Sequence, residues 1–285
     1  MTFEISPFLK WAGGKTRLLP QLHRFLPNLV GRGYVEPFLG SGAMFFHIIQ
    51  TRRPKRVMLM DANPDLVNLF IQIRDNLHDL IPLLITHRDH HNAPGISSEE
   101  RKAYYYRVRD IDLPASGTPE SAARFLYLNK TCFNGLHRLN SNGKFNVPMG
   151  SYRDPSIFNE EHLAVVAILL NGVHLSTADF RQAENLIQDG DFVYLDPPYE
   201  PISATSSFTS YTKDRFTSDH QKDLRDMLIR VSNRCQFMLS NSTAPLIENL
   251  YNLPGMSKNY VLSGRSINSK GNGRGKIKEL VVTNY

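Results

Sequence analysis

The sequence predicts an α/β protein that combines a doubly wound sheet with an inserted, mainly helical subdomain. Three observations predict this class. Short apolar runs end in acidic or glycine-rich turns, segments with helical periodicity lie between them, and from about residue 62 to residue 150 helical patterns follow one another without a strand. Short continuous apolar runs are typical of buried parallel strands, and their alternation with helices is typical of a doubly wound sheet.

Each predicted strand is a short apolar run. In chain order the runs cover residues 34–38, 57–61, 173–176, 192–196 and 237–240, with a last strand at 279–283. The segments with helical periodicity cover residues 16–26, 41–50, 64–84, 159–170, 218–231 and 244–251. Asn63 before Pro64, and Ser218 before Asp219, are capping residues ahead of an apolar stripe, so they mark two helix starts.

The predicted insertion covers residues 62–150, and residues 1–61 and 151–285 supply the sheet. A polar stretch at residues 140–143 predicts a hairpin near residues 138–148. Residues 121–153 contain five Lys or Arg and no Asp or Glu, and aromatic side chains lie between the basic ones. This combination predicts a surface that contacts a phosphate backbone. A second stretch without acids, residues 258–278, predicts a flexible basic loop.

Composition narrows the functional classes. The 285 residues are 41% hydrophobic and 21% charged, which excludes a disordered or collagen-like chain. A net charge of +6 favours polyanionic partners. Two cysteines without a CxxC motif predict no disulfide framework and a reducing compartment. The longest apolar run, residues 163–170, is too short to span a bilayer, so a cytoplasmic protein without a membrane partner is expected.

Three histidines, His87, His90 and His91, have spacings that could place them on one helix face. No other pattern of metal ligands accompanies them, so we expect solvent-exposed histidines and no metal site.

A glycine-rich turn at residues 36–42, Glu-Pro-Phe-Leu-Gly-Ser-Gly, follows a strand and precedes a helix. This is where a doubly wound sheet binds a nucleotide-like ligand. Asp61 ends the next strand, 19 residues after Gly42, and can accept hydrogen bonds from a ribose diol. Phe45 stands where a dinucleotide fingerprint needs its third glycine, and Leu9 stands where a P-loop needs its first, so neither NAD nor ATP fits.

The sequence Asp196-Pro197-Pro198-Tyr199 ends another strand. Two prolines make the turn rigid and contribute carbonyl acceptors without competing N–H donors. The Asp196 carboxylate and the Pro197 carbonyl could together hold both hydrogens of a planar amino group, and the Tyr199 ring could stack on a flat heterocycle. The turn therefore predicts a site for an aromatic amine.

These motifs in this order resemble the Dam family of DNA adenine N6-methyltransferases. The resemblance rests on residues 8–15 (Phe-Leu-Lys-Trp-Ala-Gly-Gly-Lys), 36–42 and 196–199, and it covers nearly the whole chain. It also includes residues 134–138, 145–150, 208–211, 240–241 and the C-terminal basic loop. The resemblance implies a Rossmann-like methyltransferase sheet, no metal, and a monomeric enzyme acting on double-stranded DNA.

The resemblance also implies the cofactor and its residues. The cofactor is S-adenosylmethionine, with Asp61 at the ribose and Asp196 near the methionine end. The implied cofactor residues are Trp11, Lys15, Glu36, Phe38, Gly40, Asp61, Asp179, Phe180 and Asp196.

The insertion is implied to read the DNA sequence while the target adenine is flipped out of the duplex. Arg138 is implied to donate to guanine, Leu136 and Pro148 to contact base edges, and Phe133 with Asn134 to fill the gap in the stack. Lys130, Lys144 and Arg153 are implied to contact phosphates, and Asn140 belongs to the same surface. Relatives with this hairpin methylate GATC, so GATC is the expected target.

Two alternative functions stay open. An RNA adenine methyltransferase would share the Asp196-Pro197-Pro198-Tyr199 turn but would be expected to lack the duplex-reading hairpin. A DNA-binding regulator could keep the fold and lose catalysis, although the intact turn and Asp61 argue against it. Methylation of a protein glutamine is less favoured, because that group usually has Asn where this chain has Asp196.

Overall fold

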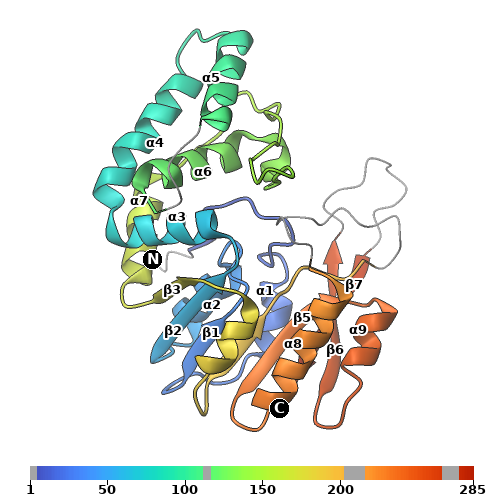
Figure 1. Cartoon of the computed structure of the whole chain (residues 1–285). Coiled ribbons are helices and arrows are strands. Elements are labelled where there is room, and N and C mark those ends of the chain that lie inside the picture. The colour runs from blue at the N-terminus through green and yellow to red at the C-terminus, as the bar shows by residue number, and fades with distance from the viewer. Residues whose placement is uncertain (1–4, 112–116, 202–215, 265–275) are drawn as a thin grey trace.

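The fold is described from a computed structural model, which covers residues 5–111, 117–201, 216–264 and 276–285 (Figure 1). A seven-stranded sheet has the order β3-β2-β1-β4-β5-β7-β6. The strands are β1 (Gly33–Glu36), β2 (Arg56–Asp61), β3 (His174–Thr177), β4 (Phe192–Leu195), β5 (Gln236–Ser242), β6 (Ser257–Gly264) and β7 (Lys276–Thr283). Strands β1 to β5 pair in parallel, and β7 pairs antiparallel with both β5 and β6.

Helices cover both faces of the sheet, as a doubly wound fold requires. They are α1 (Leu19–Leu22), α2 (Ala43–Thr51), α3 (Pro64–Asp75), α4 (Leu77–His91), α5 (Ser98–Asp110), α6 (Pro119–Thr131), α7 (Glu160–Leu170), α8 (Ser218–Val231) and α9 (Pro245–Leu250), with short 3-10 turns η1 (His23–Phe25), η2 (Phe133–Gly135) and η3 (Phe180–Asn185). Alternate strand residues enter two different cores: Tyr34 packs with α2 on one face, and Val35 packs with α8 on the other. The predicted α/β class is confirmed.

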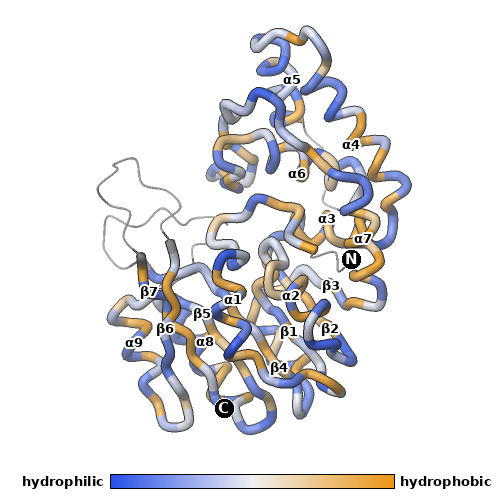
Figure 2. Tube along the Cα trace, turned by 180° about the vertical axis from the view of Figure 1, so that it is seen from behind, coloured by the Kyte–Doolittle hydropathy of each residue, from blue (hydrophilic) through white to orange (hydrophobic). Residues whose placement is uncertain are grey.

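Of the helices between β2 and β3, α3 packs against these two strands, whereas α4, α5 and α6 gather beyond the end of the sheet where the parallel strands finish (Figure 1). A third core of buried residues lies among α5, α6 and the chain that follows them, and includes Tyr105, Tyr127 and Val147. Hydrophobic and hydrophilic residues alternate along these helices, as amphipathic packing requires (Figure 2). The polar stretch at residues 140–143 does turn the chain back, with one antiparallel bridge between Leu139 and Phe145.

Four sequence expectations need correction at the level of elements. The helix expected over residues 64–84 is two helices, because Asn76 leaves the helical conformation and caps α3. The expected helix over residues 16–26 contracts to α1 and a 3-10 turn. Asn63 caps α3 as expected, whereas Thr217, not Ser218, caps α8 with its hydroxyl. The basic stretch at residues 258–278 begins in strand β6 and ends in β7; its middle, residues 265–275, lies outside the described residues.

Strand β6 was missed for a physical reason. It is one of the two edge strands of the sheet, and Tyr260 and Leu262 on it are exposed while Val261 is buried. Edge strands carry polar and charged residues that protect them from pairing with other chains, so they lack the continuous apolar run of a central strand.

Of the three α4 histidines considered in the sequence, His87 and His91 also differ from expectation. His90 is exposed, but His91 is buried with Nδ1 2.9 Å from the Tyr127 hydroxyl, and His87 Nδ1 lies 2.7 Å from the Tyr104 hydroxyl. Burial lowers the pKa of His87 and of His91 to about 4, so both are neutral partners of buried tyrosines. Within the described ranges no group of three metal-ligating side chains occurs, and no helix is long and apolar enough to cross a membrane.

Candidate active site

The candidate site lies where the strand order reverses, between β1 and β4. In an open α/β sheet, ligands bind beyond the carboxyl ends of the strands at this point. Glu36 ends β1, Asp61 ends β2, and Asp196 follows β4, so three acidic residues from distant parts of the sequence meet at one edge. The sheet brings together the glycine turn and the Asp196 turn that the sequence predicted separately.

Asp61 holds the glycine turn in place. Its Oδ2 accepts a hydrogen bond from the Gly40 backbone N–H at 3.0 Å, and its Oδ1 accepts one from Asn63 N–H at 2.9 Å. Gly40 has φ +50°, and a Cβ atom there would lie 3.1 Å from Cδ1 of Trp11. The close approach of the Trp11 ring to the turn therefore depends on a residue without a side chain.

Glu36 is buried at the centre of this edge. The Tyr34 hydroxyl donates to its Oε2 at 2.6 Å. Burial raises the pKa of Glu36 well above its ordinary value, and the neighbouring carboxylates of Asp196 and Asp61 add to the increase. Burial also raises the pKa of Asp61.

Aromatic rings form one wall of the site. Phe38, in the glycine turn, stacks on Phe180 with ring centroids 5.5 Å apart, and Phe216 lies against both rings. Phe180 is buried, but Asp179 is exposed, and its carboxylate is paired with Arg181 at 3.1 Å. The structure thus brings Phe180 to Phe38, while the Asp179 carboxylate is engaged with Arg181. Phe216 is a wall residue that the sequence did not indicate.

Lys15 anchors the Asp196 turn. Its buried Nζ lies 2.8 Å from Asp196 Oδ1, donates to the Gly13 carbonyl at 2.8 Å, and lies 4.6 Å from the Tyr199 ring centroid. The pKa of Asp196 is raised to about 6, mainly by burial and also by the negative charge of Glu279. The Lys15 ammonium opposes this rise. Asp196 therefore stays ionised at neutral pH although it is largely shielded from water.

Two residues that the sequence analysis missed support the same turn. Glu279, on β7, accepts the Tyr199 hydroxyl proton at 2.7 Å and lies 4.0 Å from Lys15 Nζ. Gln221, on α8, is fully buried and donates to the Pro198 carbonyl at 3.0 Å, while Asn241 Nδ2 donates to its Oε1. Glu279 could have been noticed in the sequence as a single acidic residue at the start of a predicted apolar strand. Nothing local in the sequence singles out Gln221.

The basic and aromatic residues expected at DNA follow α6. Phe133 is 50% exposed, and Asn134 has φ +55°, which turns the chain sharply beside it. Arg138 is exposed, and its Nε donates to Asn146 Oδ1 at 2.7 Å. Asn140 Oδ1 accepts from Lys144 N–H at 3.0 Å and so closes the loop between them. Lys144, Pro148 and Arg153 are exposed, and Leu136 is half-buried.

Lys130 differs from the other basic residues. It is half-buried, and burial together with the nearby Lys10 lowers its pKa to about 8. Lys10 Nζ donates to the Lys130 carbonyl at 3.2 Å, and the Lys10 backbone exchanges hydrogen bonds with the Asn129 amide. These bonds join the segment that carries Trp11 and Lys15 to the end of α6. Residues 208–211 of the family resemblance lie outside the described residues.

Comparisons with known proteins identify the family of this chain. The family model for D12 class N6 adenine-specific DNA methyltransferases matches residues 11–261. The chain is 40% identical to the type II methyltransferase M.MjaIII of Methanocaldococcus jannaschii, over 99% of this chain and 100% of that protein. It is 39% identical to the type II methyltransferase M1.LlaDCHI of Lactococcus lactis subsp. cremoris, over 99% and 96%. It is 34% identical to a DNA adenine methylase of Vibrio cholerae, over 96% and 94%. Matches of this extent establish that the chain belongs to the D12 class N6 adenine-specific DNA methyltransferases.

Proposed function

We propose that this enzyme transfers the methyl group of S-adenosylmethionine to N6 of the adenine in GATC, after that adenine has flipped out of duplex DNA. One observation carries the proposal: the glycine turn after β1 and the Asp196 turn after β4 lie side by side at the switch point of the sheet. A cofactor on the first turn and an acceptor amine on the second would therefore be neighbours. All of these residues come from one chain, so a monomer would suffice.

The residues at the sheet edge fit S-adenosylmethionine, which methyltransferases of this kind generally use. The Asp61 carboxylate accepts the backbone N–H groups of Gly40 and Asn63 on different oxygens, and with about four lone-pair sites it can also accept a ribose hydroxyl. Carboxylates suit the cationic methionine end, and the Phe38–Phe180 pair offers a surface for a flat base. The residues that would bind the cofactor are Trp11, Lys15, Glu36, Phe38, Gly40, Asp61, Asp179, Phe180 and Asp196. When bound, the cofactor supplies a methyl group already activated on a sulfonium.

The Asp196 turn would handle the acceptor amine. The N6 lone pair of adenine is delocalised into the ring, so N6 is a poor nucleophile. Hydrogen bonds from N6 to the Asp196 carboxylate and the Pro197 carbonyl would favour a pyramidal nitrogen and stabilise the positive charge that develops on it. The Tyr199 ring, whose hydroxyl is held by Glu279, would stack on the extruded base.

Residues 62–150 would recognise the target. The half-exposed Phe133 ring is suited to occupy the gap that a flipped base leaves in the stack. The Asn146 contact fixes the orientation of the Arg138 guanidinium, which favours a directional contact such as guanine O6 and N7. Lys130, Lys144 and Arg153 would contact phosphates. Because the pKa of Lys130 is lowered, a bound phosphate would raise it again, since a nearby anion favours the charged form of the amine.

The first test measures transfer of tritiated methyl groups from S-adenosylmethionine to matched duplexes. One contains GATC, one contains GATC already methylated at N6, and one contains a scrambled site. Incorporation confined to the unmodified GATC duplex is expected. Incorporation into every duplex would discard GATC and keep the enzyme class. No incorporation into DNA, with transfer to RNA instead, would favour the alternative of an RNA methyltransferase, and binding without any transfer would favour a regulator.

The roles of the basic residues make a separate prediction. Arg138→Ala should relax discrimination at one guanine, with a change of about 1–3 kcal/mol between the right and wrong base. Lys144→Ala should instead weaken binding to all duplexes alike and reduce the salt dependence of binding. Affinities for GATC and for single-substitution duplexes at several salt concentrations separate the two effects. Indistinguishable profiles for the two variants would refute this division of roles.

The pKa of Asp196 predicts a pH dependence. The ionised carboxylate is a stronger hydrogen-bond acceptor for N6 than the protonated acid, and it carries the negative charge that would face the developing positive charge, so single-turnover methylation should fall as the pH drops through about 6. Glu279→Gln keeps an acceptor for Tyr199 but removes a negative charge that raises the pKa of Asp196. The inflection of the pH–rate profile should then move to lower pH. An inflection that stays in place or moves upward would show that Glu279 does not act on Asp196 in this way.

A further inference from the structure

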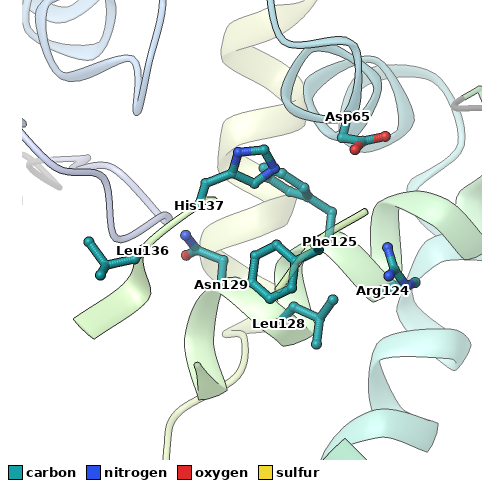
Figure 3. A pocket seen from close by; sticks show the side chains of 8 residues that line it. Asp65, Arg124, Phe125, Leu128, Asn129, Leu136 and His137 are labelled. Carbon is teal, nitrogen blue, oxygen red and sulfur yellow. The ribbon is translucent and has the colours of Figure 1, made fainter. Parts of the chain in front are cut away.

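His137 lies at the junction between the two halves of the proposed site. Its side chain is only 7% exposed, although its sequence neighbour Arg138 faces solvent. The His137 ring stacks on Trp11, with centroids 6.0 Å apart and planes 25° apart, and it contacts Phe125 and Phe145 at 5.5 and 5.8 Å. Figure 3 shows the ring beside Phe125, in a small pocket that Asp65 of α3 and Arg124 of α6 also line.

Two contacts connect His137 to the glycine turn. Through the stack it touches Trp11, the ring that a Cβ atom on Gly40 would approach to 3.1 Å. Its Nδ1 also lies 3.5 Å from Nδ2 of Asn63, whose backbone N–H donates to Asp61. Gly40 N–H donates to the other oxygen of the same Asp61 carboxylate. Both routes from His137 therefore end on the pair of residues that shapes the candidate ribose site.

Two further contacts connect His137 to the hairpin. Arg138 follows it directly, and the Arg138 carbonyl accepts a hydrogen bond from Asn146 N–H at 3.1 Å. Phe145, the neighbour of Asn146, packs on the His137 ring. A displacement of the ring would thus move both sides of the loop that presents the Arg138 guanidinium. Because packed interiors transmit such displacements, the ring is a mechanical link between the two sites.

We propose that His137 is a positioning residue that couples the placement of Trp11 to the placement of Arg138, so that cofactor and target DNA each strengthen the binding of the other. The inference rests on the proposed function, because it takes Trp11 as a cofactor residue and Arg138 as a base-reading residue. Coupling of this kind is reciprocal: the factor by which DNA tightens cofactor binding equals the factor by which cofactor tightens DNA binding.

The chain provides its own reporter, since Trp11 is its only tryptophan. Its fluorescence is titrated with S-adenosylhomocysteine, which cannot transfer a methyl group, with and without a saturating GATC duplex. The ratio of the two dissociation constants is the coupling factor, which we expect to be at least about fivefold in the unmodified protein. In His137→Ala the factor should fall below about twofold, while affinity for S-adenosylhomocysteine alone changes less than about threefold.

His90→Ala is the matched control, because His90 is an exposed histidine stacked on Tyr104 in the same group of helices. It should keep the coupling factor of the unmodified protein. Thermal unfolding without ligands shows whether each variant is folded. Should His137→Ala fail to fold, His137→Phe keeps the ring stack and His137→Gln keeps a polar group without it. A coupling factor that is retained in His137→Phe and lost in His137→Gln supports the proposal. Equal coupling factors in the two variants, or a larger one in His137→Gln, overturn it.

Failure of the inference and failure of the function are distinguishable. An unmodified protein that binds S-adenosylhomocysteine and duplex with a coupling factor of one, or a His137→Ala variant with unchanged coupling, overturns the role of His137 and leaves the methyltransferase proposal intact. An unmodified protein that binds neither molecule overturns both.

Discussion

Replacing Asp196 with Asn is expected to slow methyl transfer in a single turnover by about 10²- to 10³-fold, with cofactor affinity changed much less. The amide preserves the shape of the side chain but removes the negative charge that would face the developing positive charge on N6. Since this interaction strengthens only as the reaction proceeds, its loss should lower the rate more than the binding. Rapid-quench measurement of labelled methyl transfer, beside titration of S-adenosylhomocysteine, separates the two quantities.

Glu184→Gln is a suitable control for Asp196→Asn. Glu184, on η3, forms an ion pair with Arg230 on α8 and makes no contact with Asp196 in the described residues. It should transfer methyl groups at the rate of the unmodified protein. A rate for Asp196→Asn within about threefold of that value would contradict an acceptor role for this carboxylate.

Replacing Lys15 with Met is expected to lower the free energy of unfolding at pH 8 by about 3–5 kcal/mol. The change leaves the Asp196 carboxylate near Glu279 without the buried ammonium between them. Without Lys15 the pKa of Asp196 should rise above about 6, since the ammonium opposes the rise. A carboxyl whose pKa is raised in the folded state disfavours folding above that pKa and relaxes once protonated. The stability deficit should therefore be larger at pH 8 than at about pH 5.

Urea denaturation at the two pH values measures this deficit directly. Lys222→Met serves as its control, because Lys222 forms an exposed pair with Asp219 and its loss should change stability little at either pH. A loss of unfolding free energy in Lys15→Met that is small, or that grows as the pH falls, would contradict the idea that the unpaired Asp196 carboxylate destabilises the fold.

The central strands could be recognised in the sequence because each is a continuous run of apolar residues, which is a local pattern. A strand such as β4 is buried on both faces, so every residue in it is apolar and the run ends abruptly at Asp196. The edge strand β6 has no such signature. The cap of α8 was assigned one residue late for a related reason: Thr217 and Ser218 both carry hydroxyls that can cap a helix, and only the backbone conformation selects between them.

Buried polar contacts were beyond local reasoning. His91 was expected in solvent because no other pattern of metal ligands accompanies it in the sequence, yet Tyr127 from α6 supplies a partner 36 positions away. Glu279 reaches Tyr199 across 80 positions, and Gln221 reaches Pro198 from a helix on one face of the sheet. Each of these groups is satisfied by a residue from another element, so its environment exists only after the chain has folded.

The sequence by itself determined the α/β class, the two turns at residues 36–42 and 196–199, and the types of group they carry, because strand periodicity and turn chemistry depend on adjacent residues. The tertiary structure decided which carboxylate is paired, which rings form the wall beside Phe38, and that His137 lies between Trp11 and the hairpin. Those outcomes depend on burial and on distances between elements, and both are set by how the sheet and helices pack rather than by any short stretch of chain.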